Sequence, residues 1–241
     1  MSEGFDYGAE VTISGSFKNP EVGAHLARVR SIIHLGMFIE SYKGTDKKPA
    51  NEVTFIFELK EDYDFDDDGV PLEISKSLAL RSGKKASISK IMKALDPKGL
   101  ATCMDDLIGK ACTLELTGST ELGEDGKPKY INFGGITGVH EKMLAAVPDL
   151  VNKGSGHVKF ADLTEEAVLE LHPIKEVADI LCKGMNYNGS IAQQIVDSIR
   201  KDDPKFAVRE AETDGSQPAT SKASPAQPEQ PAVVLDASEE F

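Results

Sequence analysis

The sequence contains no tryptophan, and aromatic residues make up 6% of its 241 residues. This scarcity excludes a large aromatic stacking surface. The three cysteines, Cys103, Cys112 and Cys182, form no Cys-x-x-Cys pair, and an odd number does not suit a disulfide framework. We therefore expect free thiols in a reducing compartment. Because no run of eighteen apolar residues occurs, we expect no membrane-spanning segment.

Motifs that carry enzyme chemistry are also missing. The chain has no His-x-x-x-His or His-Glu-x-x-His spacing, and it lacks glycine-rich phosphate loops and the Gly-x-Ser-x-Gly elbow. The acidic run Asp66–Asp68 offers clustered oxygens, but no glutamate stands at the twelfth position from Asp62 or Asp64. We therefore expect a solvated turn here, and no metal, no cofactor and no enzyme activity. A metal-dependent nuclease built on this loop is the weakest alternative.

The formal net charge is -13 and the isoelectric point is about 4.9, which taken alone argues against nucleic-acid binding. The charge is unevenly distributed, however. Residues 61–69 contain six acidic residues and no basic one, and residues 207–241 contain seven acidic and two basic residues. Residues 70–99 contain seven basic and two acidic residues. The sequence therefore predicts a basic body with an acidic tail.

Alternation of apolar and polar residues predicts a mainly β fold. In residues 52–60 this alternation is strong, so we expect Phe55 and Phe57 in the core and Glu58 and Lys60 on the opposite face. The first predicted strand is long, covering residues 24–35 and continuing over 37–44 after a bend at Gly36. The other predicted strands are residues 52–60, 72–81, 111–118 and 130–139.

An amphipathic helix is predicted over residues 86–95, between the third and fourth strands. The order of three strands, one helix and two strands is that of a five-stranded OB-fold barrel. A small sandwich with one helix would give the same order. We expect this domain to span residues 1–142, a helical extension to span 143–206, and the tail at 207–241 to be disordered. The short helices expected in the extension begin near Thr164, Pro173 and Ser190.

Basic residues stand beside aromatic ones on one half of the predicted barrel. A protein that binds single-stranded nucleic acid needs cations along the phosphates and flat side chains on which bases stack. The segment from Tyr42 to Lys48 supplies both and follows the first strand, where an OB-fold lines its binding cleft. A solubilising role in a turn is the alternative for Lys47 and Lys48. The candidate DNA-binding residues are Arg28, Arg30, Tyr42, Lys43, Lys47, Lys48, Lys76, Arg81, Lys84, Lys85 and Tyr130.

Several segments of the sequence resemble those of a known protein family. The runs GAHLARVRSIIHLGMFIESYKG, NEVTFIFELKED, DGVPLEISKSLALR, KASISKIMKAL, DDLIGKACTLEL and YINFGGITGV resemble the single-stranded-DNA-binding proteins of tailed bacteriophages, over roughly residues 15–140. The resemblance implies an OB-fold that binds and protects single-stranded DNA without sequence specificity, in phage DNA replication, recombination and repair. It also implies a location in the cytoplasm of the infected bacterial cell.

The last residues, DASEEF, are similar to the acidic tails of such proteins. The resemblance implies that Asp236, Glu239, Glu240 and Phe241 recruit replication and recombination partners such as a polymerase or a helicase–primase. The acidic tail also imitates a polyanion, so we expect it to occupy the basic cleft when DNA is absent.

The sequence leaves one rival function open, an OB-like module that binds a protein and no nucleic acid. Three roles remain open for the helices at 161–200: packing on the barrel, self-association into a homo-oligomer, and binding of another replication protein.

Overall fold

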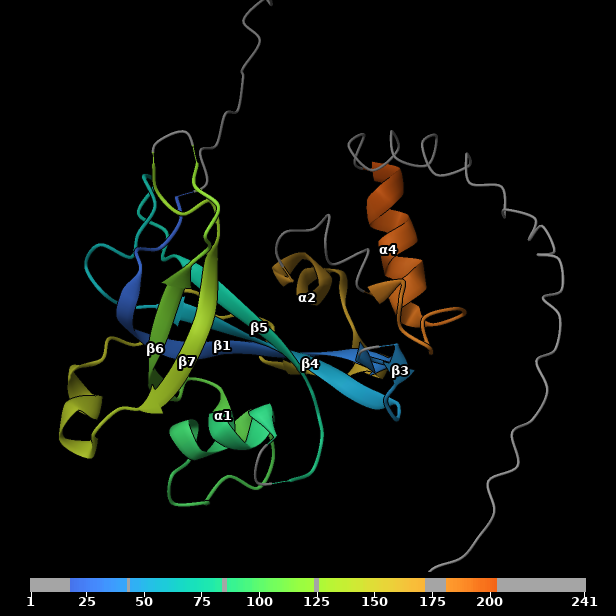
Figure 1. Ribbon diagram of the computed structural model, residues 1–241, viewed down its shortest axis with the longest axis horizontal. Helices are drawn as coiled ribbons and strands as arrows, with labels where there is room; N and C mark the ends of the chain where they lie inside the picture. The colour runs from blue at the N-terminus through green and yellow to red at the C-terminus, as the bar shows by residue number, and fades with distance from the viewer. Residues whose placement is uncertain (1–17, 43, 84–85, 124–125, 172–180, 203–241) are drawn as a thin grey trace, which may run out of the picture.

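The computed structural model describes residues 18–42, 44–83, 86–123, 126–171 and 181–202. In these ranges the protein is mainly β, with a curled antiparallel sheet and few helices (Figure 1). The five long strands lie in the order β5-β4-β1-β6-β7, and neighbours are antiparallel. Their bounds are β1 Gly23–Phe38, β4 Ala50–Leu59, β5 Glu73–Ala79, β6 Ala111–Gly118 and β7 Ile131–Gly138.

The first strand continues through an irregularity at Gly36, as predicted, but it ends at Phe38. Its pairing with β4 shifts register between Val29 and Ser31 and again between His34 and Gly36. Gly36 has a φ of 101°, and a Cβ there would lie 2.5 Å from the side-chain oxygen of Asn186. Only glycine accepts both conditions without rearrangement. Beyond β1, the chain forms a small antiparallel hairpin in place of the predicted extended stretch. Its strands are β2 Ser41–Tyr42 and β3 Thr45–Asp46.

The register shifts in β1 allow one strand to serve two hydrophobic cores. Ile32 packs in a first core inside the curled sheet, together with Phe55 and Phe57 as the alternation predicted. The next residue, Ile33, packs in a second core with Ile56 of β4. That second core is closed by residues of the C-terminal part: Leu163, Ala167, Val168, Leu171, Leu181, Tyr187, Ala192 and Val196.

The helix α1, Ser87–Leu95, follows β5 in the sequence and packs on the first core through Ile91 and Leu95. It contacts β7 closely, because a Cβ on Gly138 would lie 2.7 Å from the carbonyl oxygen of Ala94. The helix predicted over residues 86–95 is therefore present, and it covers one end of the sheet (Figure 1).

The C-terminal part lies against β1 and β4 in short elements. As predicted, Thr164 caps α2, accepting a hydrogen bond from the Ala167 amide at 3.2 Å. The predicted helix that begins at Pro173 falls largely on residues 172–180, outside the described residues. The remaining elements are η1 Asp105–Leu107, η2 Glu141–Ala146, β8 His157–Val158, η3 Phe160–Asp162, α2 Glu165–Glu170 and α4 Ile191–Asp202. In the part of the chain that the structure describes, each helix is too short or too polar to cross a lipid bilayer.

Candidate nucleic-acid interface

Arg28, a candidate DNA-binding residue, projects from the outer face of β1, but its side chain binds the protein itself. Its Nε donates to the carbonyl of Pro148 at 2.7 Å, Nη1 to that of Gly109 at 2.6 Å and Nη2 to that of Val147 at 2.8 Å. An ion pair to Asp149 adds to these contacts at 3.3 Å. The guanidinium therefore holds the backbone of a segment far along the chain.

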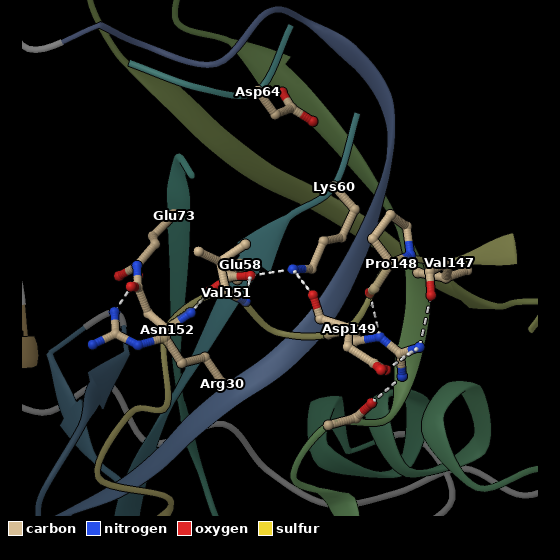
Figure 2. A network of polar contacts seen from close by, with 12 residues as sticks. Arg30, Glu58, Lys60, Asp64, Glu73, Val147, Pro148, Asp149, Val151 and Asn152 are labelled. Atoms are coloured by element: carbon tan, nitrogen blue, oxygen red, sulfur yellow. Dashed lines mark hydrogen bonds and ion pairs between the residues drawn. The ribbon is translucent and has the colours of Figure 1, made fainter. Parts of the chain in front are cut away.

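The same segment is held by two buried charges, Glu58 of β4 and Lys60 directly after it (Figure 2). The carboxylate of Glu58 accepts hydrogen bonds from the amides of Val151 at 2.8 Å and Asn152 at 3.0 Å. Lys60 forms an ion pair with Glu58 and donates to the carbonyl of Asp149 at 2.6 Å. We call residues 147–152 the covering segment. It is bound mainly through its backbone, which leaves the Asp149 side chain 97% exposed.

Arg30 is engaged as well. It pairs with Glu73 of β5 and lies 3.5 Å from Glu170 of α2. Burial raises the pKa of Glu73, and the charge of Arg30 opposes that effect. Glu170 also accepts from the hydroxyl of Ser31 at 2.5 Å and the amide of Ser155 at 2.6 Å. Arg30 therefore joins β1, β5 and α2.

The outer face of β1 and β4 is thus closed. The carboxylates of Glu58, Glu73 and Glu170 lie beside the arginines, and they would repel a phosphate. Arg28 is directly opposite Glu58 in the register of the two strands, and Glu58 is opposite Glu73. The alternation of residues along each strand predicts that these charged side chains lie on one side of the sheet. It does not predict which of them are cross-strand neighbours, because that depends on strand register.

Two predicted cations, Lys47 and Arg81, meet beyond the other end of β1, and a third, Lys48, follows Lys47 in the chain. The Nζ of Lys47 donates to Oε2 of Glu40 at 2.8 Å, and Nη2 of Arg81 lies 3.6 Å from the same oxygen. Lys48 is exposed beside Lys47. The backbone supports this arrangement, because the Lys47 amide donates to the Glu40 carbonyl and the Leu80 amide donates to the Asn51 carbonyl. We call Lys47, Lys48 and Arg81 around Glu40 the hairpin-end surface.

A depression of about 450 Å³ adjoins the hairpin-end surface through Arg81. Tyr42 belongs to the same hairpin, since its backbone pairs with Thr45. The predicted residues Lys43, Lys84 and Lys85 lie outside the described residues. The depression is lined by Met37, Pro49, Ala50, Asn51, Leu80, Arg81 and Ser82.

Two other predicted residues lie beside β7, one contacting it and one directly before it. Lys76 of β5 places its Nζ 5.7 Å from the ring centroid of Phe133 in β7, a cation–π contact that the sequence did not indicate. Tyr130 is 54% exposed just before β7, with the Nζ of Lys129 at 5.4 Å from its ring centroid. Phe133 could have been identified as the partner of Lys76 only by knowing that β5 and β7 approach each other.

The acidic loop forms a compact turn. Asp66 Oδ1 accepts hydrogen bonds from the amides of Asp68 at 3.0 Å and Val70 at 2.7 Å. Among the described residues, no group of three or more His, Cys, Asp or Glu side chains could hold a metal ion.

The tail residues Asp236, Glu239, Glu240 and Phe241 lie outside the described residues. Comparisons of the chain with protein-family models, with curated proteins and with solved structures found no match.

Proposed function

We propose that the protein binds single-stranded DNA without sequence specificity through the hairpin-end surface. The observation that carries this proposal is the convergence of Lys47 and Arg81 on one carboxylate oxygen, although they come from separate segments. With Lys48 exposed beside them, they place several positive charges within reach of neighbouring phosphates.

The strand order supports the finer description of the fold as a five-stranded OB barrel. Its strands would be β1, β4, β5, β6 and β7, with α1 between the third and the fourth. In that fold the connection between the first two strands flanks the binding cleft, and here this connection contains the hairpin and Lys47.

Stacking supplements the charges. Tyr42 in the hairpin and the exposed Tyr130 are the proposed stacking residues, each worth ~1–3 kcal/mol per base. With so few aromatic residues, most of the affinity is electrostatic. Binding therefore weakens steeply as salt rises, because DNA releases counterions when the lysines and arginines replace them.

The biological role that we propose rests on the sequence resemblance: protection of single-stranded DNA during phage replication and recombination in the cytoplasm of an infected cell. The acidic tail at 207–241 is proposed to compete with DNA and to recruit partner proteins. Deleting it is expected to raise DNA affinity at low salt, and unchanged or lower affinity in a titration would contradict the competition.

Exposed apolar side chains favour the alternative, a protein-binding module. Met37, Ile39 and Met185 are 38%, 44% and 56% exposed, and the Met185 amide donates to the Met37 carbonyl at 2.7 Å. These residues lie at the same end of β1 as the hairpin-end surface. A protein that bound there would contact both the apolar residues and the cations.

A fluorescence anisotropy titration separates the two functions. Labelled oligothymidine of about 30 nucleotides and a duplex of equal length are titrated at about 50 mM and about 200 mM salt. DNA binding predicts preference for the single strand, strong salt dependence, and about threefold weaker binding by Lys48→Ala. Lys142→Ala, which removes an exposed lysine of η2, is the matched control. Absence of binding at both salt concentrations would leave the protein-binding module.

A further inference from the structure

Glu40 occupies the centre of the hairpin-end surface. Its Oε2 accepts the hydrogen bond from Lys47 at 2.8 Å and is 3.6 Å from Nη2 of Arg81. The hydrogen bond from Lys47 holds the pKa of Glu40 below its usual value, so its carboxylate is charged at neutral pH. One anionic oxygen of the protein therefore lies between two of the cations that the proposed function assigns to phosphate.

Arg81 is incompletely paired. Its Nε and Nη2 are buried and make no hydrogen bond, and the contact of Nη2 with Glu40 is longer than a hydrogen bond. These two nitrogens form the side-on edge of a guanidinium, which binds two oxygens of a carboxylate or a phosphate together. Glu40 lies at the Nη2 end of this edge and leaves both nitrogens without a hydrogen bond.

The position of Glu40 is set by the backbone. Its carbonyl accepts from the Lys47 amide at 2.8 Å, which closes the hairpin at its base. A second carboxylate, Glu52, has a pKa raised by burial and by the charge of Glu40, and Arg81 opposes both effects. The cations of this surface thus already have carboxylate neighbours, and a phosphate must compete with them.

We propose that Glu40 is a built-in competitor of the DNA backbone: it occupies the place of a phosphate between Lys47 and Arg81 and is displaced when single-stranded DNA binds. Once it moves away, the side-on edge of Arg81 takes two phosphate oxygens and Lys47 a third. The competition keeps affinity below what the cations alone would give and eases release of the strand. This inference rests on the proposed DNA-binding function.

The test is Glu40→Gln, which keeps the size of the side chain and removes its charge. We expect about fivefold tighter binding of oligothymidine at about 50 mM salt, and a smaller gain at about 200 mM. Glu141→Gln is the control, because Glu141 of η2 forms an ion pair with Lys98 that is more exposed and lies outside the hairpin-end surface. In the double variant Glu40→Gln/Arg81→Gln, the gain should disappear.

Each outcome bears on the competition. An equal change in Glu40→Gln and Glu141→Gln would show only an effect of net charge and would overturn the competition while DNA binding stands. Weaker binding by Glu40→Gln, with an unchanged urea midpoint, would instead show that Glu40 positions Lys47 for DNA. Absence of binding by the wild type and all variants would overturn the proposed function and the competition with it.

Discussion

Two groups of predicted cations, one on β1 and one in the segments before β4 and after β5, differ in what they contact. On the outer face, Arg28 binds backbone carbonyls of the covering segment, and Arg30 pairs with the half-buried carboxylates of Glu73 and Glu170. At the hairpin end, Lys47 and Arg81 share a single partly exposed carboxylate. A buried charge with fixed partners stabilises the fold, whereas a cation at an exposed ion pair gains little from its partner and can exchange it for a ligand.

The largest effect is expected from Glu58→Ala. Removing this carboxylate leaves Lys60 buried without its ion-pair partner and two backbone amides without an acceptor. We expect a loss of about 3–5 kcal/mol in the free energy of unfolding, measured by urea denaturation. The control Glu141→Ala should leave the urea midpoint nearly unchanged, since its pair with Lys98 is exposed. Comparable losses of stability in both variants would show that the buried ion pair of Glu58 stabilises the fold no more than an exposed pair does.

The second-largest loss of stability is expected from Arg28→Ala. Its three hydrogen bonds to carbonyls are lost, and we expect a decrease of about 2–3 kcal/mol in stability. Limited proteolysis should then detect faster cleavage near residues 147–152. The affinity for oligothymidine, measured where the variant is folded, should stay within about twofold of the wild type. A large loss of affinity at unchanged stability would place Arg28 in the DNA site and break the comparison.

Within the hairpin end, Tyr42→Ala and Lys47→Ala separate stacking from charge. Stacking is little screened, so Tyr42→Ala should weaken binding by ~1–3 kcal/mol at both low and high salt. Lys47→Ala should weaken binding at low salt and reduce the slope of log affinity against log salt by about 1. Titrations at several salt concentrations measure both slopes. Equal slopes for the two variants would contradict these assignments.

The smallest effect concerns pH. His157 of β8 hydrogen-bonds to Asp105 at 2.9 Å and to His34 of β1 at 3.0 Å, which ties β8 to the sheet. Burial, then the charges of His157 and Lys159, lowers the pKa of His34 from its ordinary value of 6.5. The folded state therefore binds fewer protons than the unfolded state, and this stabilisation is present above pH 6.5 and is lost as the pH falls through the lower folded pKa.

His34→Gln should therefore lose less stability than the wild type between about pH 7 and about pH 5. We expect a difference below about 1 kcal/mol, because solvent screens this half-exposed group. Urea denaturation at the two pH values measures it. An identical pH dependence in both proteins would show that the contact between the imidazoles does not control the stability of this face.

Local sequence patterns correctly predicted much of the secondary structure. The alternation in residues 52–60 correctly placed Phe55 and Phe57 in the core, and the helical period placed α1 within a residue of its observed start. The same alternation assigned Glu58 and Lys60 to the opposite face without showing that this face is buried. The sequence also could not show that Ile32, rather than Ile33, shares the core of Val29, since an odd separation on one face requires the register shift with β4 between Val29 and Ser31.

The candidate site likewise contains residues that the sequence identified and one that it did not. The sequence singled out Lys47 and Arg81 by charge, but it did not point to Glu40, which lies between them. Glu40 could have been suggested only by its position at the base of a hairpin that the sequence did not predict.

By itself the amino-acid sequence determined the long strands, the helix between β5 and β6, and the cap of α2, because these depend on residue periods and side chains within a few positions of one another. Only the tertiary structure decided which charges are covered and which stay accessible. That depends on strand register and on residues 147–171 packing against β1 and β4, and contacts between segments so far apart in the chain leave no local pattern.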